Sequence, residues 1–111
     1  MKKTVIKTNQ NAYFLRYSIN AHCEAEELLG FPITQLDENT AGISVFRTLM
    51  FVGLKHGGQQ ITLEQAGDIM EEVINDRGME YLSEQISKAI NAGLSQQNKD
   101  NFKRDHNKKQ N

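Results

Sequence analysis

Between residues 63 and 94, apolar and polar side chains alternate with the period of an α-helix. From 63 to 75 the apolar residues recur every three or four positions and share one side of a helix, and the polar residues share the other. The apolar side consists of Leu63, Ala66, Ile69, Met70, Val73 and Ile74, and the polar side of Glu64, Asp68, Glu71, Glu72 and Asn75. From 79 to 94 the inward positions are Met79, Leu82, Ile86, Ala89 and Ile90. We predict two helices, 63–75 and 79–94, that pack antiparallel across a short link.

Capping residues mark where the helices begin and end. Thr62 and Gln65 have the spacing of a capping box, in which each side chain accepts a hydrogen bond from the other residue's free backbone N–H. Ser18 can cap a helix over 19–29, and Gly30 can supply the left-handed residue that ends it.

The segment 40–56 is apolar over a wider arc than the other helices. Its apolar positions are Ile43, Val45, Phe46, Leu49, Met50, Val52 and Leu54. An arc of roughly 200° is typical of a central helix that is buried on more than one side. We predict a cap at residue 39 or 40 and an end at the Gly57-Gly58 pair. Two glycines within the arc, Gly42 and Gly53, would allow a neighbouring backbone to approach closely.

Two side chains allow more than one interpretation. Phe51 projects from the polar strip of the 40–56 helix. It either lies under the N-terminal segment or is an exposed aromatic anchor for a partner protein. Glu26 has Cys23 and Leu29 one turn away on either side, which favours a partly buried, hydrogen-bonded carboxylate over a contact to a partner.

The N-terminal segment predicts a β-hairpin. Residues 4–7 are rich in β-forming types, 8–11 form a polar turn cluster, and Tyr13, Leu15 and Tyr17 fall on one face with period two. A lone hairpin is marginal in water, so we expect one of its faces to pack on the helices.

The fold class follows from these elements. We predict a mainly α protein, a small bundle of about four helices over 18–94 preceded by the hairpin over 4–17, within a single globular domain of residues 1–94. The segment 95–111 contains one large apolar residue, Phe102. It is therefore predicted to be a flexible, polar, basic tail.

Charge is distributed unevenly, although the net charge is only −1. Residues 1–17 carry +4 and 95–111 carry +3, whereas 18–56 carry −3 and 57–94 carry −5. The overall balance gives no electrostatic reason to bind nucleic acid or an anionic membrane. The charged segments are interpreted either as solvated surfaces or as parts of different copies that attract one another head to tail.

No group of residues predicts catalysis, and we expect the chain not to be an enzyme. Cys23 and His56 have no spacing that supports a nucleophile and its base. Glu71 and Glu72 are interpreted as a solvated helix face. The histidines and the single cysteine are too scattered for a metal site, and no phosphate-binding glycine loop is present. We therefore predict no catalytic residue, no cofactor and no metal.

The expected setting is a reducing one. The single cysteine, Cys23, cannot form a disulfide within the chain, and no apolar segment typical of a signal peptide follows the basic residues 1–7. No stretch approaches the roughly 20 apolar residues needed to cross a bilayer. We predict a soluble, cytoplasmic protein without a membrane partner.

Four runs of sequence, taken in order, resemble a known family. They are residues 13–21 (YFLRYSINA), 23–30 (CEAEELLG), 47–56 (RTLMFVGLKH) and 61–67 (ITLEQAG). This order is similar to that of the tail assembly chaperones of long-tailed phages and prophages, including the related proteins of gene transfer agents. The resemblance covers about residues 4–94, and it aligns Glu26 and Gly30 with the end of the family's first helix.

The resemblance implies a function in protein binding. Members of this family bind the long, apolar tape measure protein while the tail is built, help to recruit the tail tube protein and have no catalytic residue. They tend to self-associate into homo-oligomers, act in the host cell cytoplasm and are absent from the mature virion.

A chaperone for such a client needs apolar surface. Our candidates for this surface are Phe31, Ile33, Leu36 and Phe51, to which Glu26 is added as a possible protein contact. Phe31, Ile33 and Leu36 lie in the loop 31–39, which holds more apolar residues than a plain connector requires. The alternative is that the loop residues cap the core between the helices 19–29 and 40–56.

Two other functions compete with the chaperone. One is a generic adaptor or regulator that binds other proteins. The other is a small DNA-binding regulator, because residues 61–66 resemble the start of a helix-turn-helix. The acidic side chains of the helix that follows argue against DNA, since a phosphate backbone would repel them.

Overall fold

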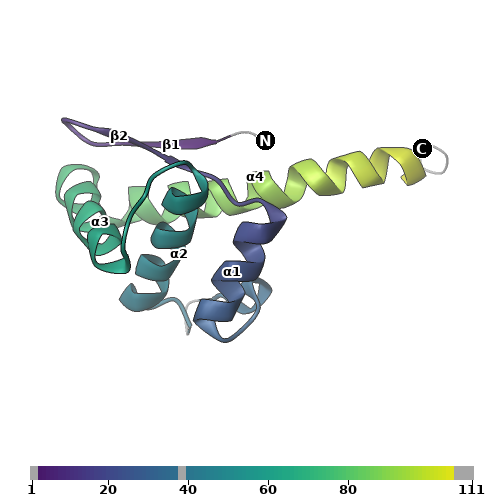
Figure 1. Ribbon diagram of the computed structural model, residues 1–111. Helices are drawn as coiled ribbons and strands as arrows, with labels where there is room; N and C mark the ends of the chain where they lie inside the picture. Colours follow the sequence, from purple (N-terminus) through teal and green to yellow (C-terminus); the bar gives the residue numbers. More distant parts are fainter. Residues whose placement is uncertain (1–2, 38–39, 107–111) are drawn as a thin grey trace.

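The computed structural model describes residues 3–37 and 40–106, with side chains described up to Leu94. In this part of the chain a two-stranded antiparallel hairpin is followed by four α-helices, with a 3-10 turn between the first two (Figure 1). The elements are β1 (Thr4–Lys7), β2 (Ala12–Leu15), α1 (Ile19–Leu29), η1 (Ile33–Gln35), α2 (Ile43–His56), α3 (Leu63–Arg77) and α4 (Met79–His106). The predicted fold class, mainly α with an N-terminal hairpin, is confirmed.

Helix ends that depend on local caps lie where the sequence predicts them. The Ser18 hydroxyl accepts a hydrogen bond from the backbone N–H of Ala21 at 3.2 Å, and Gly30 ends α1 with a φ of 84°. Thr62 and Gln65 form the capping box at the start of α3, with N–H···O distances of 3.1 Å and 2.9 Å. These caps satisfy backbone groups that a helix end otherwise leaves free.

Other helix ends differ from the prediction. α2 begins at Ile43 with Gly42 as its cap, because Thr40 belongs to a turn: its hydroxyl accepts from the Asp37 N–H at 2.9 Å. Residue 39, the other predicted cap, lies outside the described residues. α4 continues past 94 to His106. Residues 95–106 contain neither glycine nor proline to stop the helix, and residues 107–111 lie outside the described part.

α2 is the central element, as its wide apolar arc predicted. It contacts α1, α3, α4 and β2. Its buried residues are Leu49, Met50, Val52, Gly53 and Leu54. They pack with a core that includes Ile6, Leu15 and Tyr17 from the hairpin segment, Val73 from α3, and Leu82 and Ile86 from α4.

Gly53 of α2 and Gly57, which caps the end of this helix, allow the hairpin to lie directly on α2. A Cβ added at Gly53 would be 2.5 Å from the Tyr17 hydroxyl, and one at Gly57 would collide with the carbonyl of Phe14. In the space so created, the Tyr17 hydroxyl donates to the carbonyl of Leu49 at 2.6 Å. The missing side chains therefore fix where β2 crosses the second half of α2.

The hairpin turn is held on α3 by a carboxylate. Glu72 accepts hydrogen bonds from the hydroxyls of Thr8 and Tyr13, each at 2.6 Å, and from the Asn11 amide at 2.9 Å. These bonds lower the pKa of Glu72. Burial and the neighbouring carboxylate raise the pKa of Tyr13 to about 12. Glu71 is exposed, as a solvated face predicts, whereas Glu72 is half-buried and bonded to the hairpin turn.

Candidate protein-binding site

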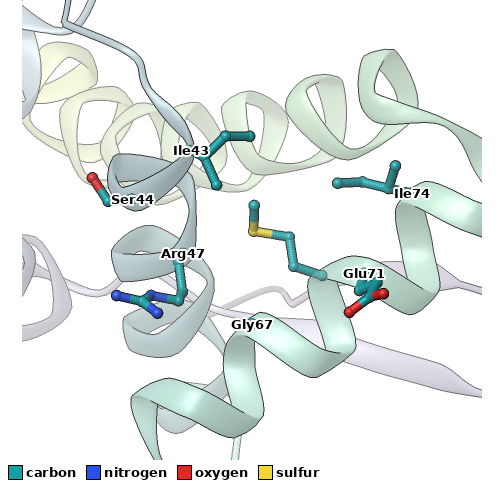
Figure 2. A pocket seen from close by; sticks show the side chains of 7 residues that line it. Ile43, Ser44, Arg47, Gly67, Glu71 and Ile74 are labelled. Carbon is teal, nitrogen blue, oxygen red and sulfur yellow. The ribbon is translucent and has the colours of Figure 1, made fainter.

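A groove lies between the first half of α2 and the middle of α3, with a volume of about 490 Å³. Figure 2 shows its lining from close by. The lining residues are Ile43, Ser44 and Arg47 from α2 and Gly67, Met70, Glu71 and Ile74 from α3. A largely apolar hollow with a few polar groups at its edge is the usual form of a binding site. We call it the α2–α3 groove.

The apolar surface of the groove runs from the core to solvent. Met70 is buried with 4% exposed, Ile74 is half-buried against the core, and Ile43 is 64% exposed. Ile43 is the most exposed of the large apolar residues in the described part of the chain. It is the first residue of α2 and therefore projects beyond the packed half of the helix. A partner that covers such surface gains about 25 cal/mol of binding free energy for each Å² of apolar surface removed from water.

Two opposite charges border the groove, Arg47 on α2 and Glu71 on α3 (Figure 2). Both are exposed, and neither side chain has an ion pair or hydrogen bond with any described residue. Gly67 lets the arginine lie against α3, since a Cβ there would be 3.2 Å from the Arg47 Cδ. Both charges are thus available to a partner.

Other charges of the helices are already used within the fold. Glu24 of α1 accepts from Lys55 and His56 of α2, each at 2.8 Å. The hydrogen bond from Lys55, followed by that from His56, lowers the pKa of Glu24. This cluster joins α1 to α2 on the other side of α2 from α3, and its pairing contrasts with the unpaired groove charges.

Acidic residues extend from the groove along α3. Glu64, Asp68 and Glu71 are all exposed and follow one another at spacings of four and three residues. Residues at these spacings lie on one side of a helix. Of the three carboxylates, Glu71 lines the groove, and Glu64 and Asp68 extend the acidic side of α3 beyond it.

The residues predicted from the sequence do not form one surface. Ile33 is buried, and Leu36 and Phe51 are half-buried against the core. Lys55 lies over the Phe51 ring, 5.6 Å from its centre. Phe31 is half-buried in a separate depression with Pro32 and Cys23. The capping interpretation of the loop thus describes Ile33 and Leu36 well, and Phe31 is the member of the set that does not pack on the core.

Glu26 has a local partner. One of its carboxylate oxygens accepts a hydrogen bond from the backbone N–H of Ile33 at 2.8 Å. The side chain is half-buried, as the apolar neighbours of this position predicted. It ties the end of α1 to the turn η1 and so holds the loop against the helix.

The sequence interpretation missed the groove because it assigned the apolar residues that line it to buried faces. Ile43 was included in the apolar arc of α2, and Met70 and Ile74 in the apolar side of α3. A signal was present: Gly67 interrupts the apolar side of α3 opposite Arg47. The missing side chain leaves room there for the stem of Arg47, which lies against α3.

Within residues 3–37 and 40–106, no group of three or more histidine, cysteine, aspartate or glutamate side chains is placed to hold a metal ion. Among the helices described, none has the combination of length and apolar character that crossing a membrane requires. Comparison with known proteins finds no matching family model, no matching curated protein and no matching solved structure.

Proposed function

We propose that this chain is a tail assembly chaperone of a long-tailed phage or prophage, and that its α2–α3 groove binds a helical segment of the tape measure protein. The observation that carries the proposal is the groove, an apolar hollow of about 490 Å³ whose edge residue Ile43 is 64% exposed. Open apolar surface of this kind is typical of a site for another protein. The resemblance of residues 4–94 to the family supplies the identity of the client.

The groove suits an amphipathic helix. Such a helix presents apolar side chains at positions i, i+3 or i+4, and i+7, which can pack on Ile43, Met70 and Ile74. Arg47 and Glu71 would then pair with an acidic and a basic residue of the client on opposite sides of the groove. The expected client segment therefore has an apolar stripe with charges of both signs beside it.

The groove can bury only a few apolar side chains of a client, and this small number limits the affinity of one contact. Each apolar side chain that it buries contributes about 1.5–3 kcal/mol, whereas association costs at least about 4 kcal/mol. A single groove therefore binds weakly. Many copies along one long client hold it soluble together, since linked weak sites gain avidity. Weak individual contacts also let the tail tube protein, which the chaperone helps to recruit in the host cytoplasm, displace it before the virion is complete.

The test is co-expression with the tape measure protein of the same phage or prophage, followed by size-exclusion chromatography with light scattering. We expect a soluble complex with many copies of this chain per client. Ile43→Asp places a carboxylate at the groove edge and should reduce the bound copies at least tenfold. The matched control is Leu28→Asp, because Leu28 is 54% exposed on α1 and does not line the groove.

Other outcomes would decide against the proposal or relocate the site. If the tape measure protein stays insoluble and this chain elutes alone, the chaperone function is wrong and an adaptor for a different protein replaces it. If Leu28→Asp removes binding as strongly as Ile43→Asp, the groove is not the site. Phe31→Asp then tests the surface that the sequence suggested.

A further inference from the structure

The outer side of the hairpin is a second exposed apolar surface, on which the Lys3 ammonium donates to the carbonyl of Gly57 at 3.1 Å and lies 5.8 Å from the centre of the Phe14 ring. Residues alternate along a strand, so Lys3, Val5 and Lys7 share one face of the β1 segment. Phe14 pairs with Val5 across the hairpin, and Arg16 follows it by two positions. Val5 is 37% exposed and Phe14 is 45% exposed. We call these five residues the hairpin face: an apolar centre bordered by three cations and no anion.

The α2–α3 groove combines apolar side chains with an acidic side on α3. Its apolar residues are Ile43, Met70 and Ile74, its α3 lining includes Glu71, and Glu64 and Asp68 continue the exposed acidic side of α3 beyond the lining. Its α2 side carries one cation, Arg47, whereas the hairpin face carries cations alone. Complementary potentials of this kind steer association and fix the register of a contact.

The two surfaces cannot meet within one molecule. β2 crosses α2 at Gly53 and Gly57, whereas the groove begins at Ile43. The rise of an α-helix places Gly57 about 21 Å along α2 from Ile43. In Figure 1 the hairpin accordingly lies over one end of α2 and the N-terminal end of this helix lies away from it. A contact between the surfaces therefore needs two copies.

We propose that the hairpin face of one copy docks on the α2–α3 groove of a second copy. Phe14 enters between Ile43 and Ile74, and the cations lie along the acidic side of α3. Arg47 on the α2 side repels them, which fixes the orientation of the hairpin. Each copy keeps one free surface of each kind, so the contact is head to tail and builds an open chain or a closed ring. The contact does not depend on the proposed client.

The experiment uses charge reversal in the full chain, followed by sedimentation velocity over a range of protein and salt concentrations. The hairpin variant is Lys3→Glu/Lys7→Glu, and the groove variant is Asp68→Lys/Glu71→Lys. We expect the wild-type chain to associate at low salt and less at high salt, because exposed charges are screened. Each variant alone should bind itself about tenfold more weakly or worse, since like charges then face each other.

Mixing makes the test specific. The groove variant keeps a basic hairpin face, and the hairpin variant keeps an acidic groove, so an equimolar mixture should associate again in alternation. A single chain that carries all four substitutions has the charges of both surfaces reversed, so it should associate with itself. The control Glu80→Lys/Glu84→Lys changes the net charge as the groove variant does, at two exposed positions of α4, and should associate like the wild type.

Three results would overturn the inference. They are a monomeric wild-type chain at all concentrations, variants that associate like the wild type, and a mixture that stays monomeric although thermal unfolding shows both variants folded. A wild-type chain that stays monomeric would mean that the hairpin face does not bind a second copy and that its partner is a different, acidic protein. None of these results bears on the tape measure protein, which is absent from the experiment, so the co-expression test stands apart.

Discussion

Gly53→Ala tests whether the hairpin segment rests on α2 as the structure shows. The added Cβ would lie 2.5 Å from the hydroxyl oxygen of Tyr17, 2.7 Å from its Cζ and 2.9 Å from a methyl group of Leu15. Both neighbours are fully buried core residues. Neither can move aside without disturbing β2, and the Tyr17 hydroxyl would leave its 2.6 Å hydrogen bond to the carbonyl of Leu49.

The expected magnitude follows from three contributions. Overpacking a core costs about 1–3 kcal/mol, and a buried hydroxyl without its acceptor costs about 1–3 kcal/mol. Alanine in place of glycine within a helix stabilises the folded state by about 1 kcal/mol. We expect a net loss of about 1–5 kcal/mol in the free energy of unfolding, with a midpoint of about 3 kcal/mol. For a domain of this size the midpoint corresponds to a fall of roughly 12–24 °C in Tm.

Urea denaturation followed by circular dichroism measures the effect, with the slope m checked to be unchanged. The control is Gly67→Ala, where the new Cβ meets only the flexible side chain of Arg47 at 3.2 Å. It should leave stability unchanged or raise it by up to about 1 kcal/mol through helix propensity. If Gly53→Ala is as stable as Gly67→Ala, the close packing of Tyr17 on α2 is refuted.

Three further predictions concern the caps and carboxylates. Thr62→Ala should cost about 1 kcal/mol of unfolding free energy by removing the cap of α3, measured by urea titration. Glu72→Gln should lower the Tm at pH 7 but much less at pH 3. The lowered pKa of Glu72 means that its contribution is complete above the ordinary glutamate pKa and is lost as the pH falls through the folded value. Glu24→Gln should cost less than about 1 kcal/mol at pH 7, because its pairs with Lys55 and His56 are partly solvated; a larger loss in urea titration would contradict that account.

The features that the sequence predicted correctly are set by neighbours along the chain. Ser18, Gly30 and the Thr62–Gln65 box lie where expected, because a cap needs only a side chain and a backbone group within three or four residues. The amphipathic side of α3 and the central position of α2 follow from helical period in the same way. Such local signals do not depend on how the helices are finally arranged.

The features that the sequence missed depend on contacts between distant segments. Periodicity assigned Ile43 to a buried arc, but its burial depends on where α3 passes, and this first residue of α2 stays 64% exposed at the edge of the groove. Glu72 looked solvated because its three donors lie about sixty residues earlier in the chain. The candidate loop around Phe31 was chosen for its composition, whereas the packing of Ile33 and Leu36 on the core uses most of that apolar surface. Period and composition identify which residues are apolar, but only tertiary packing decides which of them stay uncovered.

The two proposed contacts of the α2–α3 groove exclude each other, which gives a last prediction. If the hairpin of a second copy and the client helix both cover Ile43, each must weaken the binding of the other by the same factor. A peptide from the tape measure protein that binds the groove should therefore lower the sedimentation coefficient of the associated wild-type chain as it saturates. The same peptide should bind the hairpin variant Lys3→Glu/Lys7→Glu more tightly than the wild type, because no neighbouring copy competes for the groove. Equal affinity of the peptide for both chains, at a protein concentration where the wild type associates, would show that the client and the hairpin use different surfaces.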